Sequence, residues 1–326
     1  MSALVNILSA ALSRDPLSHL PRRSEIDWEE CLQRWEQPAS SSEEATIERA
    51  ARMVRDALAT NPWFATEGVL VEPQGSYFNN TNVRQQADMD LRVVHPALVV
   101  TRHPSAGNLS TAELYVSLPR TNQQIADELR GHVTRTLQMC FGQVIPGKKA
   151  VRISEVQGSR SDIDVVPVLT HHLIGLREEG DIGPVEGVFI FGTDGSETYN
   201  FPLQHHLRGK AKRERTGHRF KKMVRAVKSL RDEMVTHGVI GSKELPSFLI
   251  ECLVYRVEDD FFVQNETRLP RLKRILSRIE QQLNDPTWIA AAREINDSKQ
   301  LFMPAQPWDA QTVKACIQLC RLRISR

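Results

Sequence analysis

Residues 74–91, QGSYFNNTNVRQQADMDL, decide how we interpret the whole chain. The end of this segment alternates polar and apolar side chains, which is typical of a β-strand. Because side chains alternate between the faces of a strand, Asp88 and Asp90 are expected to share one face. Two neighbouring carboxylates repel each other, and a divalent cation compensates their charge. Oxygen ligands suit Mg²⁺, so the segment predicts a magnesium site.

The beginning of the same segment predicts a phosphate-binding turn. Gly75 permits a tight turn, and Ser76 is placed to cap a short helix before the chain returns into the strand of Asp88. A helix start with a hydroxyl and free backbone N–H groups binds phosphate well. A second pair, Gly158-Ser159, lies too close to Asp162 for a helix to fit between them, and we interpret it as a plain hairpin turn.

A third acidic residue is expected to reach the same place from another strand. In the segment SDIDVVP, residues 161–167, Asp162 and Asp164 share a face by the same alternation. Asp164 has an apolar residue on either side, which indicates a central strand, whereas Asp162 lies nearer the turn. A single Asp-x-Asp also occurs on ordinary exposed strands. The combination of Gly-Ser, a helix-sized gap, Asp-x-Asp and a later Asp favours a catalytic metal site.

Around these motifs the chain predicts an α+β protein with a mixed sheet, flanking helices and a helical C-terminal domain. We expect an N-terminal helical segment at 1–40, a catalytic core at 41–201 and the helical domain at 202–326. The segment 95–110 is rich in Pro, Gly and Ser and predicts a loop. Hydrophobic periodicity and capping residues give the other elements. We expect helices at 26–35, at 41–61 with a Ser41/Glu44 capping box, and at 121–140, 220–234, 247–256, 269–283 and 312–322, and strands at 69–71, 88–94, 151–156, 163–169, 188–191 and 197–200.

Composition places the chain among ordinary soluble globular proteins. It has 326 residues, of which 40% are hydrophobic and 25% charged, which excludes a disordered tail, a collagen-like repeat and a small disulfide scaffold. No stretch approaches the ~18 apolar residues of a membrane span. Residues 1–12 lack a basic leader and a cleavage site, so we predict no signal peptide. The five scattered cysteines fit a reducing compartment, and we expect a cytoplasmic protein.

One segment concentrates the positive charge. Residues 208–228 hold ten Lys or Arg and one acid. The whole chain has 42 basic and 40 acidic residues, so the rest of it carries 32 basic and 39 acidic residues. The segment predicts either a polyanionic ligand or a solvated helix face. Lys221, Arg225 and Lys228 follow one flank of an apolar helical stripe, and such a flank can face a cleft. Nucleic acid or a regulatory protein are alternative partners for residues 208–228.

Taken together, these motifs resemble those of the polymerase-β-like nucleotidyltransferase superfamily. Within it, residues 74–83 are similar to the motif of the bacterial CD-NTases, which are relatives of cyclic GMP–AMP synthase and oligoadenylate synthase. Residues 164–167 resemble the strand of the third acid in that family, and 221–228 and 246–251 are similar to segments of its helical domain. The resemblance covers roughly residues 40–260.

The resemblance implies a two-domain enzyme whose active site lies in the cleft between the core and the helical domain. It assigns two Mg²⁺ ions, with Mn²⁺ as a substitute, to Asp88, Asp90 and Asp164. It assigns Lys228 and Ser247 to the donor triphosphate and lets Phe248 stack on a base. The expected nucleotide-binding residues are Gln74, Gly75, Ser76, Lys228, Ser247 and Phe248.

The resemblance also implies the reaction. Nucleoside triphosphates, ATP foremost and GTP, UTP or CTP as alternatives, are joined into a cyclic di- or trinucleotide second messenger with release of pyrophosphate. In the family such messengers serve antiphage signalling of the CBASS type. The three acids also serve enzymes with linear products, such as oligoadenylate or RNA-end transferases. A catalytically inactive nucleotide- or RNA-binding module is a further alternative, against which the presence of all three acids, Ser76 and Lys228 argues.

Overall fold

The computed structural model describes residues 15–38, 40–83, 89–103, 120–156, 162–176 and 182–326. Asp88, the pair Gly158-Ser159 and residues 1–12 lie outside the described residues. The chain forms two compact units. The helical unit comprises residues 1–38, 79–85 and 204–326, and the sheet unit comprises residues 39–78 and 86–203. The N-terminal helical segment thus belongs to the same unit as the C-terminal helices.

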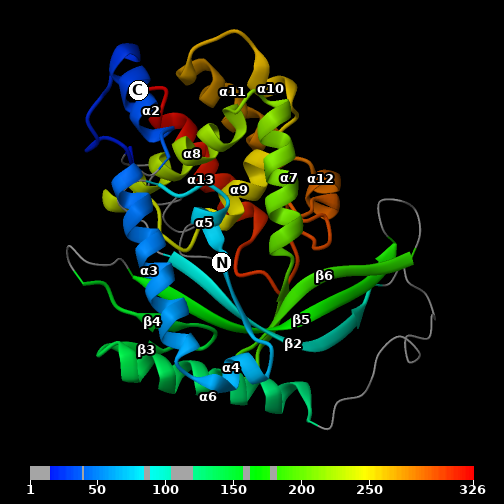
Figure 1. Ribbon diagram of the computed structural model, residues 1–326. Helices are drawn as coiled ribbons and strands as arrows, with labels where there is room; N and C mark the ends of the chain where they lie inside the picture. The colour runs from blue at the N-terminus through cyan, green and yellow to red at the C-terminus, as the bar shows by residue number, and fades with distance from the viewer. Residues whose placement is uncertain (1–14, 39, 84–88, 104–119, 157–161, 177–181) are drawn as a thin grey trace. The chain divides into compact units, whose positions relative to one another are not determined.

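The sheet unit contains one mixed sheet of seven strands (Figure 1). Its central strands β2 and β5 run parallel, and β1, β4 and β6 add to them in antiparallel fashion. The bounds of its elements are α3 Ser41–Ala59, α4 Pro62–Thr66, β1 Leu70–Gln74, α5 Gly75–Phe78, β2 Met89–Arg102, α6 Asn122–Cys140, β3 Val144–Pro146, β4 Val151–Ile153, β5 Ile163–Leu176, β6 Ile182–Phe191 and β7 Glu197–Asn200.

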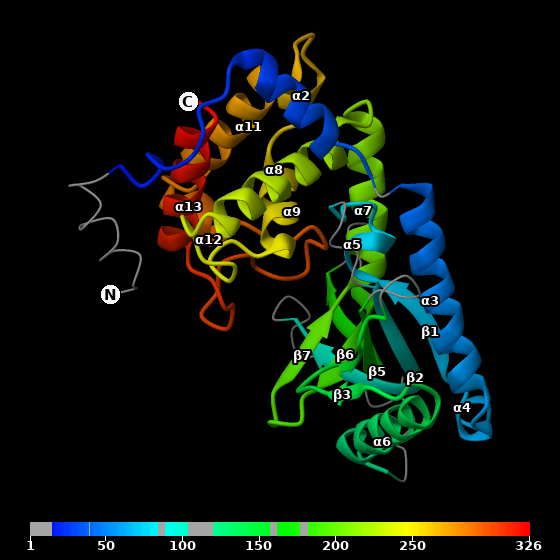
Figure 2. The same cartoon turned by 90° about the vertical axis from the view of Figure 1, so that its left-hand side faces the viewer.

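Alternation along the central strands gives the sheet two different faces. Met89 and Leu91 of β2 and Val165 of β5 are buried, and they pack in one core with α3 and α6 (Figure 2). Asp90 lies between Met89 and Leu91, and Asp164 directly precedes Val165, so both aspartates lie on the opposite face. Helices α3 and α6 supply the apolar cover of one face, whereas the opposite face carries Asp90 and Asp164 beside a smaller apolar cluster that includes Val166 and Val168.

Strand β2 is longer than the sequence predicts. We expected residues 95–110 to form a loop because of their Pro, Gly and Ser content, but β2 continues to Arg102, so this prediction is wrong up to that residue. Pro96 lies where the β2–β5 register shifts, between His95 and Leu98. Proline lacks a backbone N–H donor and is tolerated at such an irregularity, so it interrupts the pairing without ending the strand.

Capping residues define the helices of the sheet unit. Helix α6 begins after Thr121, whose hydroxyl accepts from Gln124 N while the Gln124 side chain accepts from Thr121 N, and this agrees with the predicted start. Helix α3 has the same type of capping box, but its members are Ser40 and Glu43. The predicted box was therefore displaced by one residue, because consecutive serines and glutamates offer two equivalent pairings.

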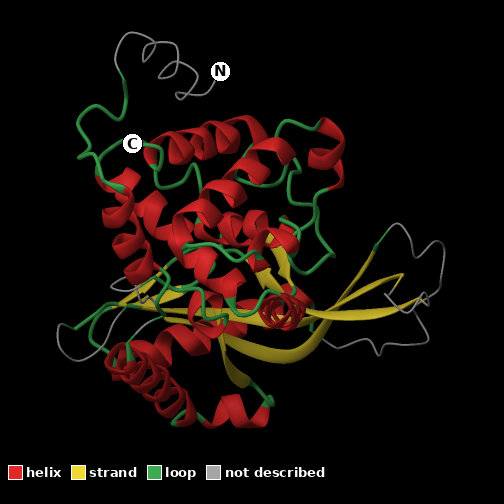
Figure 3. Cartoon of the chain, turned by 90° about the horizontal axis from the view of Figure 1, so that it is seen from above, coloured by secondary structure: helices red, strands yellow, loops and turns green. Residues whose placement is uncertain are grey.

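Among the described residues, the regular structure of the helical unit is helical, and the strands of the sheet lie in the sheet unit. Figure 3 colours the helices red and the strands yellow. Helix α9 has the predicted bounds, and the predicted helices at 220–234, 269–283 and 312–322 are confirmed to within two residues at each end. Residues 208–215, for which the sequence analysis gives no element, are helical. The elements are α2 Glu25–Trp35, α7 Pro202–Arg215, α8 Arg219–Thr236, α9 Ser247–Arg256, α10 Asp260–Val263, α11 Arg268–Gln282, α12 Pro286–Ala291 and α13 Ala310–Arg323.

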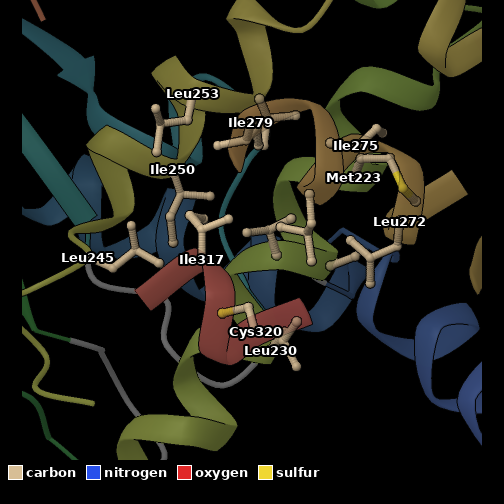
Figure 4. Packing of buried hydrophobic residues seen from close by; sticks show 14 of the residues in the cluster. Met223, Leu230, Leu245, Ile250, Leu253, Leu272, Ile275, Ile279, Ile317 and Cys320 are labelled. Carbon is tan, nitrogen blue, oxygen red and sulfur yellow. The ribbon is translucent and has the colours of Figure 1, made fainter. Parts of the chain in front are cut away.

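Helices α8, α9, α11 and α13 all contribute side chains to the core of the helical unit. Leu230 of α8, Ile250 of α9, Ile275 of α11 and Ile317 of α13 are almost fully buried and belong to one cluster (Figure 4). Burying each such aliphatic side chain contributes roughly 1.5–3 kcal/mol, so these helices support one another. No helix in the described part of the chain is long and apolar enough to span a membrane.

Candidate active site

The two described acids of the site lie opposite each other on neighbouring strands. In the parallel pairing of β2 with β5, Asp90 is the partner of Asp164, and both lie on the face away from α3 and α6. The side chain of Asp164 is 25% exposed, so a ligand in solution can reach its carboxylate. The third predicted acid, Asp88, lies outside the described residues. Residues distant in the sequence are thus brought together by strand pairing.

The Gly75-Ser76 pair lies next to Asp90. Gln74 is the partner of Asp90 in the β1–β2 pairing, and α5 begins at the following residue. Gly75 has φ = 75°, and a Cβ added to it would overlap the Asp90 carboxylate. Only glycine fits both the left-handed backbone and this close approach. The short helix that carries Ser76 is thereby packed against the strand that carries the acid.

Asp164 has a cationic partner that sequence reasoning missed. Arg152 of β4 is its register partner on the side away from β2. The guanidinium donates from Nε to Oδ1 and from Nη2 to Oδ2, both at 2.8 Å. A second acid, Asp162, has its Oδ2 3.9 Å from Arg152 Nη1. A lone Arg within a short strand gave no sequence signal for this contact, because the contact depends on the pairing of β4 with β5.

The donor set of the sheet unit fits a hard divalent cation. Asp90 and Asp164 offer carboxylate oxygens from adjacent register positions, and Mg²⁺ prefers such ligands with waters completing its shell. Within the described residues, no three His, Cys, Asp or Glu side chains form a complete metal cluster. A full set of three acids requires Asp88, which the sequence places two residues before Asp90.

The other predicted nucleotide-binding residues belong to the helical unit. Ser247 opens α9, and its Oγ accepts from Arg231 Nη2 at 2.7 Å. Phe248 is 38% exposed, and its ring centroid lies 5.6 Å from that of His205 and 6.3 Å from that of Trp308. The aromatic side chain is therefore accessible on one side and supported on the other, as stacking on a base requires.

Lys228 is buried rather than open to solvent. Its side chain is 2% exposed, and its Nζ donates to the backbone oxygen of Thr81 at 3.0 Å and pairs with the Glu251 carboxylate. Sequence analysis predicted a contact of Lys228 with a triphosphate. The ammonium charge is instead neutralised inside the helical unit, so a direct phosphate contact requires this ion pair to open.

Glu251 is the centre of a buried polar cluster that sequence reasoning did not identify. Its carboxylate accepts from Thr81 Oγ1 at 2.6 Å and from His205 Nε2 at 3.1 Å, in addition to Lys228. Burial raises the pKa of Glu251, but the Lys228 ammonium and His205 outweigh burial and hold the pKa well below its usual value. A Glu four residues after a helix-opening Ser was visible in the sequence, but its role depends on these long-range partners.

The segment that follows α5 is fixed to the helical unit by this cluster and by Arg225. Arg225, which is 4% exposed, donates to the backbone oxygen of Asn80 at 2.6 Å and to that of Glu36 at 2.8 Å. Thr81 is held as described above. Asn80 and Thr81 are thus anchored by side chains of α8 and α9.

The basic segment 208–228 is not a continuous exposed stripe. Lys212 donates to Asp259 and to the Val257 oxygen, both at 2.7 Å, and is 3% exposed. Arg225 and Lys228 are also buried and bonded, and burial lowers the pKa of Lys221 to about 8. Much of the positive charge is therefore used within the helical unit, which the amphipathic pattern alone did not indicate.

The fold and the opposed acids beside a Gly-Ser turn define a nucleotidyltransferase. The family model described as the cGAS/DncV-like nucleotidyltransferase C-terminal helical domain matches residues 207–324. The chain is 32% identical to the cyclic dipyrimidine nucleotide synthase CdnE of Legionella pneumophila, over 89% of this chain and 95% of the relative. It therefore belongs to the cGAS/DncV-like nucleotidyltransferases, or CD-NTases.

Two comparisons extend this assignment. The chain is 27% identical to a cyclic dipurine nucleotide synthase of Elizabethkingia meningoseptica, over 90% of this chain and 96% of the relative. It is also similar to the solved structure of Elizabethkingia meningoseptica CdnE cyclic dinucleotide synthase with GTP and Apcpp. That comparison has a TM-score of 0.70 and 26% identity, and it covers 90% of this chain and 97% of the other. The resemblance to the CD-NTases predicted from the motifs is confirmed.

Proposed function

We propose that the protein joins nucleoside triphosphates into a cyclic di- or trinucleotide, with release of pyrophosphate, as a signal in antiphage defence. The observation that carries this proposal is the pairing of Asp90 with Asp164 next to the Gly75-Ser76 turn. Relatives that cover nearly the whole chain are named cyclic nucleotide synthases, which supports a cyclic product. Their names include both dipyrimidine and dipurine synthases, so the base has to be determined on this protein.

We infer that two Mg²⁺ ions are held by Asp88, Asp90 and Asp164. When bound, the ions would supply Lewis-acid activation of a ribose hydroxyl and charge neutralisation on the leaving pyrophosphate. The protein's own contribution is positional. Gly75 lets the backbone approach Asp90, and the hydroxyl and N–H groups at Ser76 offer donors to the triphosphate of the donor nucleotide.

The residues of the helical unit receive two different proposed roles. Ser247 and Phe248 are partly or clearly exposed, and we keep them as contacts to the triphosphate and to a base. For Lys228, its burial and its bonds to Thr81 and Glu251 favour a positioning role. Lys228 then acts through Thr81, which follows Ser76 by five residues in the chain, rather than through the phosphates.

The test is an incubation with all four labelled nucleoside triphosphates and Mg²⁺, followed by phosphatase. Products that resist phosphatase are rings, and omission of single nucleotides identifies the bases. Products that lose their terminal phosphates are linear and would contradict cyclisation. No product from the wild-type protein, under conditions where a characterised relative is active, would favour the inactive binding module. Asp90→Asn and Asp164→Asn are the negative controls.

A further inference from the structure

The contact between Arg152 and Asp164 occupies both oxygens of a proposed metal ligand. The two N–H donors and the two carboxylate oxygens form a bidentate pair at 2.8 Å on each side. In this geometry the guanidinium occupies one lone pair on each of the two carboxylate oxygens. The side chains of Arg152 and Asp164 are 44% and 25% exposed, so the pair lies at the surface of the sheet, within reach of solvent.

A cation bound by Asp164 needs one of these same lone pairs. The guanidinium also brings a positive charge to the immediate neighbourhood of the acids, which opposes the arrival of a divalent ion. Its charge offsets the repulsion between Asp164 and its register partner Asp90. One side chain therefore stabilises the acid pair and competes for one of its members.

The neighbourhood offers the displaced guanidinium another acceptor. Asp162 Oδ2 lies 3.9 Å from Arg152 Nη1, and Asp162 Oδ1 accepts from the backbone N–H of Glu155 at 2.7 Å. The position of Asp162 is therefore fixed by the backbone. A small movement transfers Arg152 from Asp164 to Asp162 without leaving its charge unpaired.

We propose that Arg152 is a positioning residue that competes with the divalent cation for Asp164 and passes to Asp162 when the cation binds. This inference rests on the proposed function, because it takes Asp90 and Asp164 as metal ligands. Arg152 then sets the affinity of the metal site without touching the nucleotide. It holds the acids in place before the cation arrives and yields one of them afterwards.

The experiment measures Mn²⁺ binding to the nucleotide-free protein by the electron paramagnetic resonance signal of free Mn²⁺. Arg152→Ala is expected to tighten Mn²⁺ binding about fivefold, the size that an exposed, well-aligned ion pair contributes. Arg152→Lys keeps the charge but cannot form the bidentate pair, so its affinity is expected to lie between the two. In an Asp164→Asn background, the replacement of Arg152 is expected to have a clearly smaller effect, because the competition for the carboxylate is gone and only the repulsion by the guanidinium charge remains.

The matched control is Arg278→Ala, which removes another Arg that donates two bonds to a surface carboxylate, that of Glu258. Its Mn²⁺ affinity is expected to equal that of the wild type. Unchanged or weaker Mn²⁺ binding in Arg152→Ala would overturn the inference. If Asp90→Asn and Asp164→Asn bind Mn²⁺ as the wild type does, the metal site of the proposed function fails as well. If they bind it more weakly while Arg152→Ala has no effect, only the competition fails. Thermal unfolding confirms that each variant is folded.

Discussion

Replacement of Lys228 by Met tests the buried cluster of the helical unit. The variant leaves the Glu251 carboxylate, which is 5% exposed, without its ammonium partner. Removal of one member of a buried ion pair costs about 3–5 kcal/mol. Thr81 and His205 still donate to Glu251, so we expect the lower end, about 3 kcal/mol. For a unit of this size that corresponds to a fall of roughly 6–12 °C in Tm.

The assay is urea unfolding with Lys222→Met as the control. Lys222 lies on the same helix, but its side chain is 43% exposed and its Nζ is 3.7 Å from Glu36, so we expect a loss of at most about 1 kcal/mol. The double variant Lys228→Met/Glu251→Gln removes both charges and is expected to be more stable than the sum of the two single changes predicts, by about 2 kcal/mol. Strict additivity, or a loss in Lys228→Met no larger than in the control, would refute the buried ion pair.

The pH dependence of the same variant gives an independent check. In the wild type the pKa of Glu251 is held below its usual value, so its stabilising effect is present above that value and is lost as the pH falls. Without the Lys228 ammonium, the effect of burial on Glu251 is less fully offset, so the pKa of Glu251 rises. As the pH falls below about 5, the free energy of unfolding of Lys228→Met is therefore expected to fall less than that of the wild type. An equal or steeper fall would contradict the assignment.

Three further predictions concern the sheet unit. Asp90→Asn and Asp164→Asn should each lower pyrophosphate release more than about a hundredfold while the far-ultraviolet circular dichroism stays unchanged, and retained activity would remove the acids from the mechanism. Gly75→Ala should abolish activity and cost about 1–2 kcal/mol in urea unfolding, because its Cβ meets the Asp90 carboxylate at a positive φ, and a fully active variant would contradict that packing. Burial lowers the pKa of His171 to about 4, so wild-type stability should fall as the pH drops from about 6.5 toward 4, and His171→Asn should flatten this dependence in urea titrations; an unchanged slope would show that His171 is not its source.

The local part of the site could be predicted from the sequence because strand periodicity is local. The shared face of Asp162 and Asp164 follows from alternation. The strand of Asp164 is confirmed, and Asp162 lies one residue before its first residue. The facing of Asp164 by Asp90 depends on a parallel pairing between strands more than seventy residues apart, so the sequence could only predict that they converge. The part of strand β2 after residue 95 was missed because proline is common in loops. Only the pairing of β2 with β5 shows that Pro96 lies at an irregularity within the strand.

The partners of the basic residues were harder to predict than the positions of the aspartates on the strands. The resemblance to the CD-NTases assigned Lys228 to the donor triphosphate, and the apolar stripe indicated only that its flank can face a cleft. The actual partners of Lys228, Thr81 and Glu251, come from other elements, and no period in the sequence connects them. The same holds for Arg152, whose role depends on which strand pairs with β4. The sequence shows which segments are rich in Lys and Arg. Which of these side chains contacts a carboxylate depends on the packing of distant elements.

The convergence of Asp90 and Asp164 on bound cations is tested most directly by a crystal structure of the protein with Mn²⁺ and a non-hydrolysable ATP analogue. Anomalous scattering at the manganese edge locates the ions without reference to the protein. Our account predicts a manganese peak ligated by carboxylate oxygens of both Asp90 and Asp164, with the triphosphate beside Ser76. A bound nucleotide whose manganese peaks are ligated by neither aspartate would contradict it.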